Sequence, residues 1–153
     1  MKLEGTYEIQ APRERVFQAL TDPAVLQKSI PGCERMEKSG DNKYDAMLSA
    51  GVGPIKGVFT ATVSIENVTP PSNYRLVVEG KGQPGFIKGS GDLLLEERSA
   101  GTLIRYTGNV QVGGMLASVG QRMIESTAKL LAAKFFTALD SEVRASSSQP
   151  GAA

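Results

Sequence analysis

The feature that most constrains the fold is a long helical pattern at the end of the chain, after a series of short alternating segments. Apolar residues recur at helical spacing from Gly114 to Val143, which predicts one helix of about thirty residues, with charged residues such as Asp140 on its opposite face. Strands that wrap this stripe either fill the enclosed space with side chains or leave an apolar hollow. The stripe consists of Leu116, Val119, Met123, Leu130, Leu131, Phe135 and Ala138.

Between Cys33 and Val112 the apolar period falls to two, which predicts β-strands joined by tight turns. No crossover helix interrupts this stretch, so we expect successive hairpins and an antiparallel sheet. A strand from Lys2 to Ile9 precedes it, and two short helices follow that strand, the second capped by Asp22. The predicted later strands cover residues 33–38, 43–50, 57–68, 74–81, 86–96 and 102–112.

The predicted fold class is therefore α+β. A curved antiparallel sheet of about seven strands wraps a long C-terminal helix, with two short helices after the first strand. The length predicts one domain over residues 1–145, and the small polar residues 146–153 predict a disordered tail.

Composition excludes several classes of function. The formal charge of +1 argues against a nucleic-acid partner, and the chain contains no histidine and one cysteine, so we expect no metal site and no catalytic residue. Cys33 has no local base, which favours a structural role and suits a reducing cytoplasm. No apolar run approaches the roughly 20 residues that span a bilayer, so we expect any membrane contact to be peripheral, at the inner face.

Glycines and tyrosines occupy the inward register of the predicted strands. Glycines such as Gly89, Gly91 and Gly108 indicate bending of the sheet alone, or bending together with unfilled space. The tyrosine hydroxyls either bond to backbone carbonyls or orient a ligand.

We predict that apolar side chains of sheet and helix line a ligand-binding hollow. These residues are Phe59, Val63, Leu76, Val78, Leu93, Tyr106, Leu116, Val119 and Met123. Hairpin tips place lysines beside apolar residues, which predicts a membrane-contacting or cavity mouth if the tips gather at one end. The mouth residues are Pro54, Lys56, Pro84, Phe86, Lys88 and Met115.

Six short segments of the chain form a recognisable set of motifs. They are Ile-Pro-Gly-Cys-Glu at 30–34, Gly-Pro-Ile-Lys-Gly-Val-Phe at 53–59, and the segments 70–76, 89–93, 112–122 and 135–136. These motifs resemble the G-subunit family of carbon monoxide dehydrogenase, and the resemblance covers about residues 1–143. The resemblance implies a helix-grip fold of the START and Bet v 1 type, with a nonpolar cavity between sheet and helix. It also implies a role beside a molybdenum-containing hydroxylase, in membrane recruitment or in electron transfer through a bound quinone.

The function we expect is non-catalytic carriage of a lipophilic small molecule, such as a respiratory quinone, with no covalently bound cofactor. One alternative is an enzyme of the cyclase or dehydratase kind, with Tyr74 and Tyr106 as acid and base. Another is an assembly factor that binds the hydroxylase and has a filled core.

Overall fold

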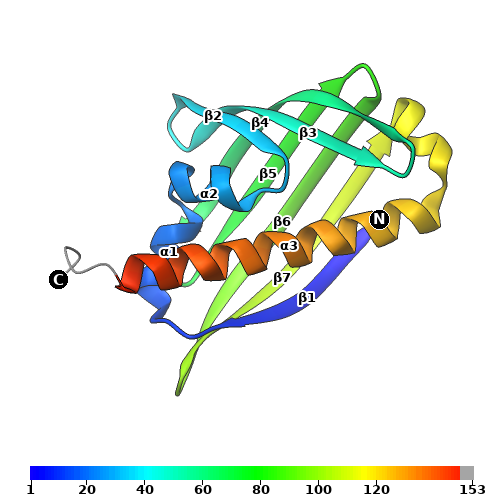
Figure 1. The fold of residues 1–153 in the computed structure, drawn as a ribbon. Helices are drawn as coiled ribbons and strands as arrows, with labels where there is room; N and C mark the ends of the chain where they lie inside the picture. The colour runs from blue at the N-terminus through cyan, green and yellow to red at the C-terminus, as the bar shows by residue number, and fades with distance from the viewer. Residues whose placement is uncertain (149–153) are drawn as a thin grey trace.

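The computed structural model describes residues 1–148, and in it a strongly curved antiparallel sheet wraps one long helix (Figure 1). Within these residues the sheet has seven strands in the order β1-β7-β6-β5-β4-β3-β2. The strands are β1 (Lys2–Ile9), β2 (Cys33–Gly40), β3 (Lys43–Val52), β4 (Ile55–Thr69), β5 (Asn73–Gly82), β6 (Gly85–Arg98) and β7 (Gly101–Gly113). The helices are α1 (Arg13–Leu20), α2 (Pro23–Ser29), the 3-10 helix η1 (Gly114–Val119) and α3 (Gln121–Ser148).

The α+β class and the antiparallel topology confirm the sequence-based prediction. Each strand from β2 to β7 pairs with its neighbours along the chain, and β7 also pairs with β1 at the edge of the sheet. The start of α2 is also as expected, because the Asp22 Oδ1 accepts a hydrogen bond of 2.9 Å from the Ala24 amide. The strands extend a few residues beyond their predicted ends, because hairpin pairing continues into the turns.

The single helix predicted over residues 114–143 is wrong at its beginning. The chain forms η1 first, then breaks at Gly120, whose φ of +97° lies outside helical space, and only then enters α3. α3 continues to Ser148, so residues 146–148 of the expected tail belong to the helix. The rest of that expected tail, residues 149–153, lies outside the described part of the chain. No helix among residues 1–148 is both long and apolar enough to cross a membrane.

Aromatic stacking fixes α3 to the sheet near α1 and α2. The ring of Phe136 lies 4.8 Å from that of Tyr106 and 5.6 Å from that of Tyr7, both at near-parallel angles. Leu139 and Val143, on the next turns of α3, are at most 1% exposed. This end of the interior is therefore close-packed. Its other fully buried side chains are Ile9, Val16, Leu20, Leu26, Tyr74, Leu95 and Ile104.

We expect Phe136→Ala to lower the free energy of unfolding by about 3–5 kcal/mol, because it removes a ring that is 5% exposed and leaves a cavity under α3. Urea denaturation would measure the loss. Thr137→Ala, at the exposed neighbouring position, is the matched control and should change stability by about 0.5 kcal/mol or less. Equal effects of the two substitutions would show that the stack does not hold α3.

Candidate functional site

At the centre of the concave face of the sheet, inward side chains are only partly buried. Leu76 and Val78 lie on β5, the strand next to β4, opposite Ile65 and Val63 of β4 in the register. The two β4 residues are at most 4% exposed, whereas Leu76 and Val78 on the same face are only partly buried. If side chains filled the interior, they would cover β5 at least as well as β4. The space above β5 is therefore not filled by side chains of the protein.

Two glycines of β6 show where the space lies. Gly91 is the cross-strand neighbour of Leu76, and Gly89 that of Val78. A Cβ built on either glycine would have no side chain within 4 Å, and its sole contact would be a β7 carbonyl oxygen at 3.8–3.9 Å. Elsewhere on the same face a side chain fills the space above the glycine, since a Cβ on Gly5 would overlap the ring of Tyr106. Unfilled space therefore lies over Gly89 and Gly91.

The middle of α3 faces this space without being buried by it. Between Ile124 and Phe136 no residue of the helix is fully buried, although both of those side chains are less than 9% exposed. Thr127, Leu131 and Phe135 are half-buried in this stretch. The helix thus spans the hollow from its anchor at Phe136 to its first turn, where Ile124 is buried again.

A cleft of about 370 Å³ adjoins the hollow at the η1 end. Val110 and Val112 of β7 line it from the concave face, and Ile124 and Gln121 line it from the first turn of α3. Val110 is the cross-strand neighbour of Gly89, so the cleft begins where the unfilled space ends. Met1, Phe86, Gln111 and Ala117 complete the lining, so the cleft combines apolar side chains with the amide groups of Gln111 and Gln121.

The residues predicted to line the hollow divide into three groups. Leu76, Val78, Tyr106 and Val119 are half-buried, and Met123 is 43% exposed. Of the half-buried four, Leu76 and Val78 border the open region, whereas Tyr106 stacks on Phe136 at the packed end. Contact of any of them with a ligand remains a prediction. The fully buried members, which belong to the packed core, are Phe59, Val63, Leu93 and Leu116.

The predicted apolar stripe of the helix is rotated relative to the observed one. Leu130 is 54% exposed and Met123 lies against Gly53 in the β3–β4 turn, whereas Ile124 and Phe136 are buried. The reason is that packing near Phe136 sets the phase of α3, while the predicted stripe runs without interruption through the break at Gly120.

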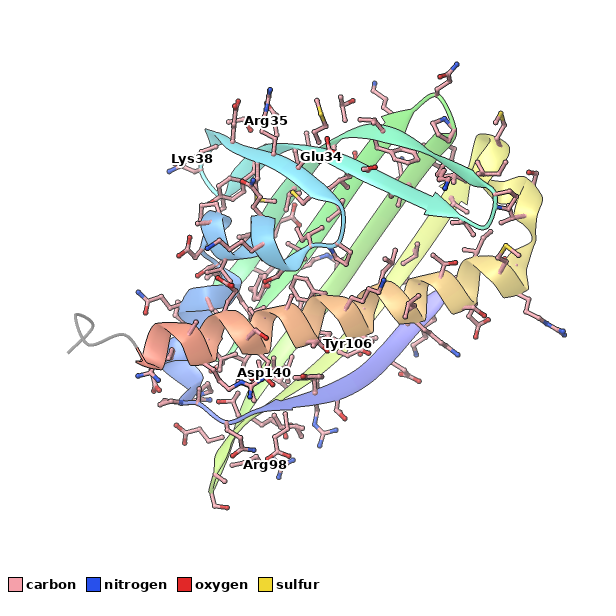
Figure 2. The ribbon with its side chains drawn as sticks, in the orientation of Figure 1. Glu34, Arg35, Lys38, Arg98, Tyr106 and Asp140 are labelled. Atoms are coloured by element: carbon pink, nitrogen blue, oxygen red, sulfur yellow. The ribbon has the colours of Figure 1, made fainter. Side chains whose placement is uncertain are left out.

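Asp140 also differs from its predicted position on the outer face of the helix. It is half-buried and turned towards the sheet, where its Oδ2 accepts a hydrogen bond of 3.2 Å from the Tyr7 hydroxyl (Figure 2). Its Oδ1 lies 3.1 Å from the Arg144 Nε one turn later. The carboxylate therefore joins the packed end of α3 to β1 instead of facing solvent alone.

The hairpin tips that are predicted to form a mouth do gather at one end, beside η1 (Figure 1). The Leu116 amide donates a hydrogen bond of 3.0 Å to the Pro84 carbonyl, which ties η1 to the β5–β6 turn. Pro84 itself is buried, so it supports the end rather than exposing an apolar surface. The exposed members are Pro54, Lys56, Phe86, Lys88 and Met115.

Polar groups that could perform chemistry lie away from the hollow. The Tyr74 hydroxyl donates to the Leu20 carbonyl at 3.3 Å, and burial raises the pKa of this phenol. The Tyr106 ring reaches across Gly5 towards β1 (Figure 2). Burial also raises the pKa of the Cys33 thiol, which donates to the Arg35 carbonyl at 3.5 Å. Among residues 1–148, no cluster of three or more carboxylate, cysteine or histidine side chains could hold a metal ion.

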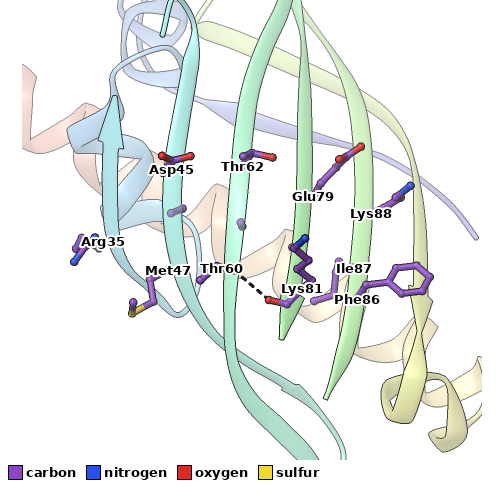
Figure 3. A pocket seen from close by; sticks show the side chains of 13 residues that line it. Arg35, Asp45, Met47, Thr60, Thr62, Glu79, Lys81, Phe86, Ile87 and Lys88 are labelled. Atoms are coloured by element: carbon purple, nitrogen blue, oxygen red, sulfur yellow. Dashed lines mark hydrogen bonds between the residues drawn. The ribbon is translucent and has the colours of Figure 1, made fainter. Parts of the chain in front are cut away.

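A separate hollow of about 650 Å³ lies on the outer face of the sheet, over β2 to β6 (Figure 3). Its wall mixes Asp45 and Glu79 with Lys81 and Lys88, and Thr60 Oγ1 donates to the Lys81 carbonyl at 3.4 Å. Met47 and Phe86 also line it, so charged and apolar side chains share its wall. The pattern of alternation gives no signal for it, because most of its residues are the ordinary outward side chains of the strands.

Solved structures of other proteins share this fold. A conserved protein from Geobacillus kaustophilus is 36% identical with a TM-score of 0.91, over 95% of this chain and 97% of that one. Ara h 8.0201 has a TM-score of 0.71 at 16% identity, over 95% and 98% of the two chains. The Zhui aromatase/cyclase from a Streptomyces species has a TM-score of 0.69 at 15% identity, over 94% and 93%. The last two likenesses show the helix-grip fold alone.

No curated protein sequence matches the chain. A family model for CoxG, the G-subunit of carbon monoxide dehydrogenase, matches residues 5–144. That range runs from β1 through most of α3 and so contains the sheet, the hollow and the anchored helix. The chain belongs to the CoxG family of carbon monoxide dehydrogenase.

Proposed function

We propose that the protein binds a lipophilic small molecule between α3 and the sheet, and that it carries this molecule without transforming it. The observation that carries the proposal is the unfilled space over Gly89 and Gly91, bordered by the half-buried Leu76 and Val78. Water is a poor occupant of such a space, because it needs two or more polar partners and the border is apolar. An apolar ligand would cover Leu76 and Val78, and it would gain about 25 cal/mol for each Å² of apolar surface removed from water.

The ligand we propose is a respiratory quinone. Its isoprenoid tail matches the apolar region beside Val78, and its ring carbonyls need hydrogen-bond donors, which the Gln121 amide in the cleft could supply. The family supports the partner, since its description is that of a carbon monoxide dehydrogenase component. We therefore propose that the protein serves a molybdenum-containing hydroxylase of this type at the cytoplasmic face of the membrane, by exchanging quinone with it.

The cyclase alternative has less support. An acid and a base must reach the substrate, but the Tyr74 hydroxyl is occupied by Leu20 and belongs to a side chain that is 1% exposed. Tyr106 stacks under Phe136 at the packed end of the interior. The assembly factor with a filled core is also disfavoured, because the core beside Gly89 is not filled.

We expect Gly89→Leu to weaken binding of a short-chain menaquinone by on the order of tenfold or more, because the new side chain would occupy the ligand's space. Titration monitored by tyrosine fluorescence would measure the affinity. The free energy of unfolding should not fall, since no side chain lies within 4 Å of the new Cβ.

Gly89→Ala is the matched control, because it makes the same change of backbone freedom but adds one carbon. It should retain most of the affinity. If Gly89→Leu binds menaquinone as well as the natural chain does, the hollow is not the binding site. If the natural chain shows no saturable binding and no copurifying lipid by mass spectrometry, the proposal of carriage fails.

The two inward tyrosines separate carriage from catalysis. We expect Tyr74→Phe to lower stability by about 1 kcal/mol, because the Leu20 carbonyl loses its donor, while menaquinone affinity stays unchanged. Tyr106→Phe should change affinity by less than about tenfold, the value of one neutral hydrogen bond. Urea denaturation and the same fluorescence titration would measure both effects. Turnover of the bound molecule by the natural chain that Tyr106→Phe abolishes, with the fold intact, would instead mark this phenol as a reacting group.

A further inference from the structure

One edge of the sheet is a regular strand whose outward backbone groups point away from the sheet. β1 is the last strand on this side, and it pairs with β7 without a bulge (Figure 1). Met1 and Val110 exchange two backbone hydrogen bonds, of 2.9 Å and 2.8 Å. Because hydrogen bonding alternates along an antiparallel strand, the odd-numbered residues of β1 direct their amides and carbonyls at β7. The even-numbered residues, Lys2, Glu4, Thr6 and Glu8, direct theirs outward.

These outward groups have no partner among residues 1–148. α3 contacts β1 on the concave face, where the Tyr7 ring stacks on Phe136 and the Tyr7 hydroxyl donates to Asp140. Those contacts leave the edge itself uncovered. An uncovered row of amides and carbonyls is a template for one more strand.

The opposite edge of the sheet is protected in ways that β1 is not. The pairing of β2 with β3 is interrupted by two register shifts. α2 also lies beside this edge, where the Gln27 Nε2 donates a hydrogen bond of 3.3 Å to the Glu34 carbonyl. Bulges and covering segments are common ways in which proteins prevent pairing at a sheet edge. β1 has neither, so only its charged side chains could prevent pairing there.

The signs of these charges favour one particular pairing of β1 with a second copy of itself. A two-fold axis through Gly5 would place Lys2 opposite Glu8 of the second copy, and Glu4 opposite Thr6, each pair twice. All four side chains are exposed on the outer face of the sheet. Opposite charges directly across an antiparallel pair stabilise it.

The neighbouring registers bring like charges together. A shift in one direction places Glu4 opposite Glu4 of the second copy, and a shift in the other places Glu4 opposite Glu8. In the single chain the Lys2 Nζ lies 3.7 Å from the Glu4 Oε2, but these side chains are 65% and 68% exposed. So exposed an ion pair contributes little, which leaves Lys2 available to another carboxylate.

We propose that β1 is a dimerisation edge, at which two copies of the chain join their seven-stranded sheets through an antiparallel β1–β1 pairing centred on Gly5. The pairing would satisfy the outward backbone groups of both copies. It would also continue the concave face, because Leu3 would lie beside Tyr7 of the second copy on the inward side. A strand of a different protein is a poorer occupant, since the charges of β1 complement those of β1 itself. The dimer requires no ligand in the hollow and so stands apart from the proposed function.

Sedimentation velocity at increasing protein concentration would test the dimer, with any affinity tag placed at the C-terminal end. Because the interface is one strand long, we expect the natural chain to change from monomer to dimer between micromolar and millimolar concentration. Lys2→Glu and Glu8→Lys should each raise the dimer dissociation constant by on the order of tenfold, because like charges then face each other twice. An equimolar mixture of these two variants should recover the dimer, since each glutamate at the interface then faces a lysine.

Thr6→Pro tests the backbone pairing separately from the charges. Proline removes the outward amide of Thr6 but no hydrogen bond to β7, so the fold should remain while the dissociation constant rises by about tenfold or more. Circular dichroism of the dilute monomer would check the fold. Thr6→Ser, which keeps the amide, is the matched control and should dimerise as the natural chain does.

Lys38→Glu is the matched control for charge, because Lys38 is exposed on β2 at the opposite edge (Figure 2). It should leave the dissociation constant unchanged. A natural chain that stays monomeric at millimolar concentration would overturn the self-pairing and leave the edge to a strand of another protein. A dimer that Thr6→Pro leaves intact, or that Lys38→Glu weakens as much as Lys2→Glu does, would lie on another surface and overturn the proposal as well.

Discussion

The stack of Phe136 on Tyr7 and Tyr106 is the contact on which the rest of the structure depends. It presses one half of α3 onto the sheet, and together with Leu139 it closes that end of the interior. α3 is buried again at Ile124, in its first turn, and between Ile124 and Phe136 no side chain of the helix is fully buried. The hollow lies between these two packed ends, over Gly89 and Gly91, where no side chain of the sheet or the helix fills the space.

Inward glycines act in two different ways in this sheet. At Gly108 a Cβ would approach the Ser90 carbonyl oxygen to 2.6 Å, so this glycine permits two strands to come close as the sheet bends. At Gly89 and Gly91 a Cβ would meet almost nothing, so bending does not require glycine there. The inward glycines therefore have different structural roles at different positions. The two glycines of β6 border unfilled space, whereas Gly108 of β7 allows two strands to approach closely.

Much of the fold could be predicted from the chain because its signals are local. Alternation indicated the strands from β1 to β7, and Asp22 marked the start of α2. The phase of α3 could not be predicted, since it depends on contacts of Phe136 with residues as distant in sequence as Tyr7. The mouth residues were found from composition at the hairpin tips, but only the fold showed that Pro84 is buried while Phe86 is exposed.

The sequence by itself determined the α+β class, the strand pairing and the absence of histidine chemistry, because these follow from periodicity, turn residues and composition along the chain. The tertiary structure alone decided that the Tyr74 hydroxyl donates its hydrogen bond to a backbone carbonyl, that Met123 lies outside the core and that space remains over Gly89. Whether a volume is filled depends on how far apart two surfaces are held. That distance is set by packing between residues distant in sequence, so no local pattern contains it.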